Sequence, residues 1–241
     1  MKSYRGNAIA AGVLFILCSA ASILSIVPLG ATVGAPVNFA TLAGSANAVV
    51  MTALIEFVWA ASGMGIVIAL YPVLRLFSPT LALGSVVARV VENVVILIGT
   101  ISLLTLLTVS QQAAGSADTT SFQATGDALV AVREWASADF VAGLAFVVGT
   151  FLYNYVMYRS RLVPRWLSGW GLVGAVLTLV AIGYAGFTQD FGFTTVNSVL
   201  MAPIGLQEMV LAVWLIAKGF NLSALSAVRS IAPPVVRSTT P

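Results

Sequence analysis

Four ionisable residues lie deep inside long apolar stretches of this sequence, where charged side chains are rare. They are Glu56, Arg89, Glu92 and Glu208. An ionised group at the centre of a bilayer costs about 2.5–3.5 kcal/mol on insertion scales, so such residues normally face the interior of a helix bundle. Buried carboxylates exchange protons and attract positive charge. The four residues therefore form a candidate site for a proton, a cation or a small solute.

The charges of these residues do not balance. Three glutamates supply three potential negative charges, whereas Arg89 supplies one positive charge. Isolated charges are costly in a low-dielectric interior, so either one or two carboxyls are protonated at neutral pH or a cation lies among them. Both states suit a site coupled to protons or cations. The alternative is an interhelical clamp built around Arg89, in which polar contacts are worth on average about 0.6 kcal/mol.

Further polar residues follow helical spacing around these charges. Arg89 and Glu92 stand at positions i and i+3, so their side chains can touch, and Asn93 continues the same stripe. Asn154 belongs to a second stripe on a later apolar stretch, which begins with Asp139. Asp139 is expected near the membrane surface, where solvent can reach it. These residues predict a polar centre in a helix bundle.

A proline adds to this pattern near the end of the chain. Pro203 lies one turn before Gln207 and Glu208. Proline lacks the N–H that would pair with the carbonyl of residue i−4, so a kink at Pro203 would free a carbonyl beside this polar pair. We treat five residues as supporting members of the candidate site, namely Asn93, Asp139, Asn154, Pro203 and Gln207.

The composition indicates that the elements carrying these residues span a membrane. The chain is 59% hydrophobic and 8% charged, with a mean hydropathy of +1.02, whereas soluble domains carry about 25% charged residues. Apolar stretches of about 20 residues, long enough to cross a bilayer, recur along the chain. The basic residues are not clustered, so no nucleic-acid partner is expected. The lipid bilayer is the expected surrounding.

The types of reactive residue exclude several chemistries. The chain has no histidine and a single cysteine, Cys18, inside the first apolar stretch. Disulfides within the chain, thiolate zinc sites and catalysis by Ser-His or Cys-His pairs are thereby excluded. We expect no metal and no cofactor, and no catalytic residues are assigned.

We predict an all-α, polytopic helix bundle with six transmembrane helices in one domain, residues 1–220. The spans are 7–29, 48–74, 79–110, 137–158, 164–187 and 196–220. The longest loop, 111–136, can form a short amphipathic surface helix in its second half and is predicted to be a linker, with a lid as the alternative. Residues 221–241 are polar and proline-containing, and we predict a disordered tail.

The distribution of basic residues predicts the orientation of the bundle. With six alternating spans, nine of the eleven basic residues fall on one side and Arg133 alone falls opposite. The nine are Lys2, Arg5, Arg75, Arg159, Arg161, Arg165, Lys218, Arg229 and Arg237. Cytoplasmic loops carry an excess of Lys and Arg. We therefore predict that both termini are cytoplasmic and that the protein is a multi-pass protein of the cytoplasmic membrane.

Four stretches carry a family resemblance that covers nearly the whole chain. They are Ala69–Leu74, Arg89-x-x-Glu92, Tyr158–Ser168, and Leu206-Gln207-Glu208 with Trp214 and Lys218-Gly219-Phe220. Together they resemble a bacterial membrane family catalogued as domain of unknown function 4386. The segment Arg159–Ser168 is the most specific of them. The resemblance implies six membrane helices and brings no assigned catalytic residues to this chain.

Three functional hypotheses follow. The first is a membrane protein with a polar, acidic intramembrane cavity that binds or moves a proton, a cation or a small solute. The second is a non-catalytic structural or regulatory subunit, with a second copy or another membrane protein as partner, whose buried charges only fix helix packing. The third is an enzyme that uses carboxylates as acid and base on a lipid or isoprenoid. It is the weakest, since the sequence has no histidine, paired-aspartate motif or nucleophile elbow.

Overall fold

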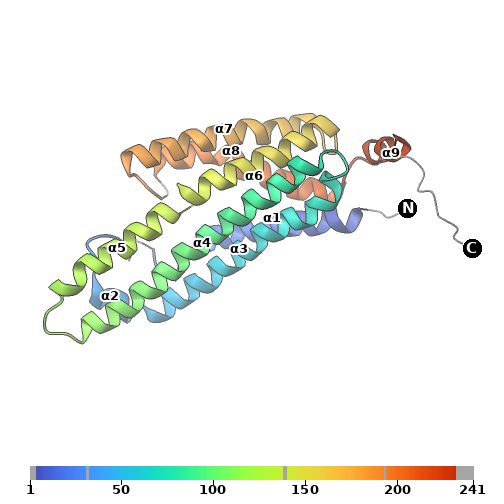
Figure 1. Cartoon of the computed structure of the whole chain (residues 1–241). Helices are drawn as coiled ribbons and strands as arrows, with labels where there is room; N and C mark the ends of the chain where they lie inside the picture. Colours follow the sequence, from blue (N-terminus) through green and yellow to red (C-terminus); the bar gives the residue numbers. More distant parts are fainter. Residues whose placement is uncertain (1–3, 31–32, 138–139, 193, 232–241) are drawn as a thin grey trace, which may run out of the picture.

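The computed structural model describes residues 4–30, 33–137, 140–192 and 194–231, and within these ranges all regular secondary structure is helical (Figure 1). The helices are α1 (Arg5–Leu24), α2 (Phe39–Gly44), α3 (Ala46–Leu74), α4 (Pro79–Ala114), α5 (Thr120–Ala136), α6 (Val141–Ser160), α7 (Arg165–Thr188), α8 (Thr195–Ala217) and α9 (Leu222–Ile231). Six helical stretches are long and apolar enough to cross a membrane: α1, α3, α4, the stretch that contains α5 and α6, α7 and α8. The prediction of an all-α bundle with six candidate membrane spans is confirmed.

Local chemistry sets where the helices begin and end. Ser78 caps α4 by accepting a hydrogen bond from the backbone N–H of Leu81 at 3.4 Å, and Pro79 occupies the first turn, where no N–H is needed. α1 ends at Leu24, before the predicted end of the first span at residue 29. Pro28 cannot donate to the carbonyl of Leu24, so the helix does not continue. α8 ends three residues earlier than predicted, because Gly219 adopts a left-handed conformation with φ +72°.

The six long helices pack in a closed ring in the order α1, α3, α4, α6, α7, α8 and back to α1. Figure 1 shows α7 and α8 along one side of the bundle and α3 and α4 along the other. The main hydrophobic core fills the ring toward the end where α9 lies, and it includes Phe15, Leu70, Tyr153, Met157 and Leu211. Side chains that face the ring interior from different helices are therefore brought together.

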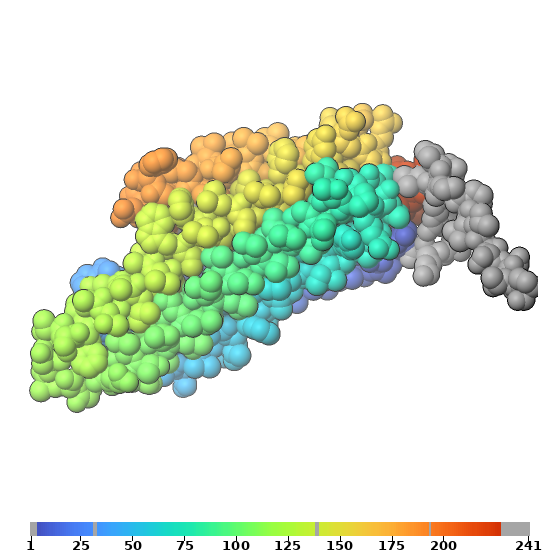
Figure 2. All heavy atoms as spheres, in the orientation of Figure 1, coloured from blue at the N-terminus to red at the C-terminus, as the bar shows by residue number. Residues whose placement is uncertain are grey.

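α4 is longer than the other helices and carries an additional helical layer. Its 36 residues span about 54 Å, against about 30 Å for the hydrocarbon core of a bilayer. α5 packs along the second half of α4, and α2 packs there as well. A second apolar core with Phe39, Leu42, Leu106 and Val130 joins them. We call this the α5 end of the bundle; Figure 2 shows that it extends beyond α7.

The region predicted as a linker with a short surface helix is thus largely one docked helix of 17 residues. Asp118 lies before α5, and its carboxylate accepts the backbone N–H of Thr120 at 2.9 Å, which lowers the pKa of this exposed carboxyl below its usual range. Asp127 accepts hydrogen bonds from the backbone N–H of Val37 at 3.1 Å and from Gln123 at 2.9 Å. The bond from Val37 fastens the segment before α2 to α5, and the bond from Gln123 lies within α5.

The opposite end of the bundle, which we call the α9 end, joins the beginning of α1 to the end of α8. The guanidinium of Arg5 donates hydrogen bonds to the backbone carbonyls of Leu215, at 3.2 Å, and Ile216. The sequence predicts a disordered tail after residue 220. In the structure, residues 222–231 form α9, and 232–241 lie outside the described residues.

Candidate functional site

The four charged residues predicted to share one site lie in two groups. The first, which we call the central cluster, contains Arg89, Glu92 and Glu208 with Tyr153 and Cys18. The second, which we call the rim pair, is Glu56 with Arg133. Sequence reasoning missed Arg133 as a site residue. Its isolation, as the single basic residue on the side opposite the other nine, was the signal available in the sequence.

The central cluster brings two carboxyl groups within electrostatic reach of one guanidinium, and the carboxyl of Glu92 is the one at ion-pair distance among the described residues. Arg89 and Glu92 lie on α4, 2% and 4% exposed, with 2.9 Å between Nη1 and Oε2. Glu208 comes from α8, interacts electrostatically with Arg89, and accepts a hydrogen bond from the hydroxyl of Tyr153 at 3.2 Å. Cys18 on α1 is buried beside Arg89. Four helices of the ring therefore meet at this cluster.

Glycines make room for the large polar side chains. A Cβ at Gly149 of α6 would lie 2.8 Å from Cγ of Arg89, so only glycine lets this side chain pass between α4 and α6. The guanidinium then lies over the ring of Phe146, 4.8 Å from its centroid. A Cβ at Gly63 of α3 would lie within 3 Å of the amide of Asn93, which donates to the carbonyl of Arg89 at 2.6 Å. The predicted residues Arg89 and Asn93 are thus held by close helix packing.

Some buried polar atoms of the central cluster have no hydrogen-bond partner among the described residues. Nε of Arg89 is buried and has no hydrogen-bond partner among the described residues. The ion pair between Arg89 and Glu92 is short, yet its two atoms are not aligned as a hydrogen bond. Buried polar atoms are nearly always paired, so this cluster departs from the usual pattern. Nη1 of Arg89 and Oε2 of Glu92 are likewise buried without a hydrogen-bond partner among the described residues.

The rim pair is compact and charge-neutral. Arg133 reaches from α5 to α3, where its Nη2 lies 2.5 Å from Oε1 of Glu56. Its Nη1 donates to the carbonyl of Gly99 at 3.2 Å, and the hydroxyl of Thr100 donates to Oε2 of Glu56 at 2.6 Å. The predicted charge count of three carboxylates against one guanidinium is therefore wrong. Arg133 neutralises Glu56, and one excess negative charge remains, in the central cluster.

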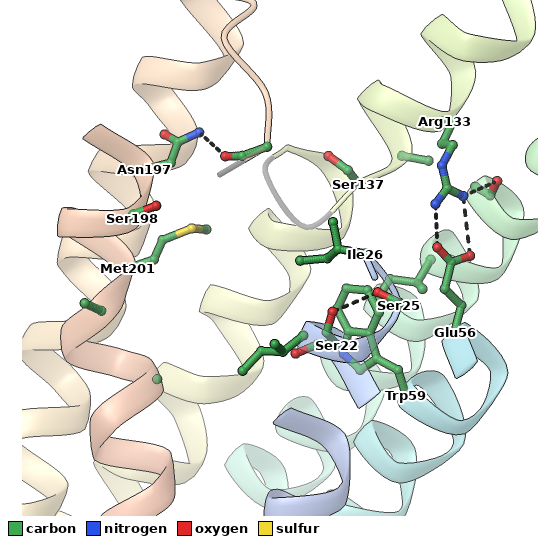
Figure 3. A pocket seen from close by; sticks show the side chains of 17 residues that line it. Ser22, Ser25, Ile26, Glu56, Trp59, Arg133, Ser137, Asn197, Ser198 and Met201 are labelled. Carbon is green, nitrogen blue, oxygen red and sulfur yellow. Dashed lines mark hydrogen bonds and ion pairs between the residues drawn. The ribbon is translucent and has the colours of Figure 1, made fainter. Parts of the chain in front are cut away.

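A cavity of about 500 Å³ opens beside the rim pair (Figure 3). Figure 3 shows Asn197, Ser198 and Met201 of α8 on one wall and Ile26 and Trp59 among the residues that face them. The lining also holds three serines from α1 and the end of α5: Ser22, Ser25 and Ser137. Apolar walls with a few hydroxyl and amide groups are typical of sites for small organic molecules.

On each of three helices, a residue that lines the floor of the cavity lies one helical turn from a residue of the central cluster. Ser22 lines the cavity and Cys18 is four residues away on α1. On α4, Ile96 lines the cavity four residues after Glu92. On α8, Gly205 lines it three residues before Glu208. One turn of α-helix advances about 5.4 Å. The cavity and the excess charge are therefore neighbouring layers of one interior.

The supporting residues have separate positions. The amide of Gln207 donates to Asn154 at 3.4 Å and to the carbonyl of Leu167 at 3.2 Å, which links α8, α6 and α7. Pro203 lies within α8, which is helical on both sides of it. Asp139 lies outside the described residues. Asn154 and Gln207 are therefore a third polar contact rather than part of the central cluster.

Metal-ligand geometry is absent from the part of the chain that the structure describes, because no three His, Cys, Asp or Glu side chains there lie close enough together to hold an ion.

No curated protein and no solved structure matches the chain. A family described as a domain of unknown function (DUF4386) matches residues 10–219, which include all six membrane-length helices or most of each. The resemblance seen in the sequence is confirmed, and the chain belongs to the DUF4386 family of multi-pass membrane proteins.

Proposed function

We propose that this protein binds a small, largely apolar solute in the cavity and moves it across the membrane together with a proton carried by the central cluster. The observation that carries the proposal is the position of Glu92 and Glu208 around one guanidinium, one turn from the cavity floor. Two carboxylates and one guanidinium leave one negative charge in a low-dielectric interior. A proton neutralises that charge at the lowest cost.

The lining of the cavity argues against a free metal cation as the transported species. Glu56 is the carboxylate that lines the cavity, and Arg133 already neutralises it. The remaining lining combines apolar side chains such as Ile23 and Met201 with serine hydroxyls. Such a surface favours a neutral or weakly polar molecule.

Glu208 is the better candidate for the proton carrier. Glu92 makes the short ion pair with Arg89 and is 4% exposed. Glu208 instead bonds to the neutral hydroxyl of Tyr153, is partly exposed, and lies on the helix whose residues Met201, Ala202 and Gly205 line the cavity. A carboxyl bonded to a neutral group loses less when it is protonated than one paired with a guanidinium.

The orientation follows from charge. The described basic residues outside the two site groups lie at the α9 end or the short loops there, as Arg5, Arg75 and Arg165 illustrate. We place this end in the cytoplasm by the excess of basic residues in cytoplasmic loops. The cavity, at the other end, then opens to the outside of the cytoplasmic membrane of a bacterium.

Proton movement tests the proposal directly. The purified chain is reconstituted in vesicles that contain a pH-sensitive dye, and an inward proton gradient is imposed with a panel of small apolar amines, alcohols and amides outside. We expect at least one solute to increase proton entry in wild type, with that increase lost in Glu208→Gln. Glu134→Gln, a change at an exposed carboxylate on α5, is the matched control and is expected to behave as wild type.

Infrared spectroscopy provides a readout that needs no solute. A protonated carboxylic acid has a carbonyl band that a carboxylate lacks, and wild type at neutral pH is expected to show one such band that Glu208→Gln removes. Absence of the band in wild type, together with no solute-dependent proton entry, would overturn the proposal.

The close packing around Arg89 favours a second function, a structural or regulatory subunit whose central cluster only fixes helix register. Gly149 and Gly63 each fit one polar side chain so closely that a methyl group would clash. On this alternative, Glu208→Gln lowers the thermal stability of the purified protein and wild type moves no protons. A variant as stable as wild type that loses proton movement excludes it.

A further inference from the structure

A second cavity, of about 510 Å³, lies at the α9 end of the bundle. It is bounded by the loop between α6 and α7 and by the end of α8. Three basic residues line it, Arg161, Arg165 and Lys218, together with Trp214 and Asn221. We call it the basic groove. The proton and solute proposed above do not use it.

Hydrogen bonds from Asn221 join the end of α8 to the loop between α6 and α7. Arg161 closes α6 in a left-handed conformation, with φ 56°. The side-chain amide of Asn221 donates to the carbonyl of Arg161 at 3.2 Å, and the backbone N–H of Asn221 donates to the carbonyl of Leu162 at 2.8 Å. Leu162 and Val163 are buried beneath, 0% and 2% exposed. The basic residues therefore stand on a fixed frame.

Among the residues that the structure describes, no acidic side chain forms an ion pair with a basic residue of the groove. The two ion pairs among the described residues are Arg89 with Glu92 and Arg133 with Glu56, and neither includes a residue of the groove. The sequence has no acidic residue after Glu208. The N-terminus of α7, which begins at Arg165, adds the positive end of a helix dipole. This combination attracts an anion with several oxygen acceptors.

The groove continues onto the lipid-facing surface of α8. Lys218, Trp214 and Val210 stand four residues apart and so form one stripe from the groove toward the bilayer centre. Val213 beside it is 60% exposed, as is Leu206 farther along. Tryptophan is common at the depth of lipid headgroups. An anion bound in the groove therefore has an apolar surface on which attached acyl chains can lie.

From this arrangement we infer that the basic groove binds the phosphate group of an anionic phospholipid, with Arg161, Arg165 and Lys218 on the headgroup and the Val210–Trp214 side of α8 along an acyl chain. Free phosphate shares the headgroup's chemistry but lacks the acyl chains. The lipid source is favoured because Lys218, one of the three basic residues, continues directly into the apolar stripe of α8. Basic pockets between membrane helices on the cytoplasmic side commonly hold such headgroups.

Native mass spectrometry of the purified full chain tests this inference. The protein is equilibrated with mixed micelles of equal phosphatidylglycerol and phosphatidylcholine, with or without inorganic phosphate. We expect selective retention of phosphatidylglycerol, weakened about fivefold for each groove residue changed to Gln. Arg159→Gln is the matched control, because Arg159 is exposed on the same helix end but does not line the groove, and it is expected to retain the lipid as wild type does.

Three other outcomes of this experiment would overturn the inference or its assignment to a lipid. Equal retention of the two lipids, or full retention by Arg161→Gln/Arg165→Gln/Lys218→Gln, overturns the inference. Displacement of the lipid by millimolar inorganic phosphate, with direct phosphate adducts, overturns the assignment to a lipid. Thermal unfolding in phosphatidylcholine alone serves as the check on folding, since groove variants without a folding defect unfold there as wild type does.

Discussion

At the scale of single residues, the rim pair differs from the central cluster in how its charges are balanced. Glu56 has a guanidinium to itself and a hydroxyl from Thr100, whereas Glu92 and Glu208 share Arg89. Removing one partner of a buried ion pair leaves a charge without compensation, which costs far more than removing both. The rim pair is therefore a place where single and double substitutions should differ.

We expect Arg133→Gln to lower the free energy of unfolding by about 1–3 kcal/mol, the cost of leaving a buried polar group without its partner, because Glu56 would then be a largely buried carboxylate without its cation. The Glu56→Gln/Arg133→Gln double variant should recover most of that loss. Unfolding of the four proteins by denaturant in the same detergent gives the coupling energy. Additive effects of the two single substitutions would show that the residues do not form a pair in solution.

At the scale of elements, the packing of α4 against α6 depends on Gly149. The Cβ of an alanine there would meet the side chain of Arg89, whose guanidinium is fixed by Glu92 and Phe146. The neighbouring helix must then move or Arg89 must leave its position. Overpacking of this kind typically costs about 1–3 kcal/mol.

Gly149→Ala is accordingly expected to destabilise the protein by about 1–3 kcal/mol, measured as the shift of thermal unfolding in detergent. Gly183→Ala is the matched control. A Cβ at Gly183 of α7 would meet nothing within 4 Å, so alanine there should leave stability unchanged or raise it by up to about 1 kcal/mol. Equal effects of the two substitutions would contradict the described contact between α4 and α6.

The helices could be predicted from the sequence because membrane spans depend on the length of apolar stretches. The contact of Arg89 with Glu92 could be predicted too, because side chains three positions apart on one helix are neighbours. The pairing of Glu56 with Arg133 could not. The two residues are 77 positions apart, and they meet only because α5 docks along α4. Gly126 of α5, which fits against the ring of Phe39, contributes to that docking through contacts that no local pattern reveals.

At the scale of the whole molecule, charge is distributed unevenly between the two ends. The α5 end carries the exposed acids Asp118, Glu134 and Asp190, while exposed basic residues such as Arg75 and Arg165 lie toward the α9 end. Because cytoplasmic loops carry an excess of Lys and Arg, we expect the α9 end to face the cytoplasm.

Labelling of introduced cysteines checks this orientation. We expect Ser116→Cys, in the exposed turn between α4 and α5, to react with a membrane-impermeant maleimide on intact cells. Arg75→Cys, exposed between α3 and α4, should react only after the cells are permeabilised. The native Cys18 is buried, so the unsubstituted chain is the background control. The opposite pattern would place the cavity on the cytoplasmic side.

The closure of the ring between α1 and α8 has a consequence for biogenesis. α1 leaves the ribosome before α8 and binds it through Arg5 and the carbonyls that end α8. Until α8 is inserted, the nascent bundle is open along one side. α4 enters the bilayer with Arg89 and Glu92 already adjacent, as a pair of zero net charge. The excess carboxyl of Glu208 arrives only with α8, so the central cluster is completed only after α1, α4 and α6 have been synthesised.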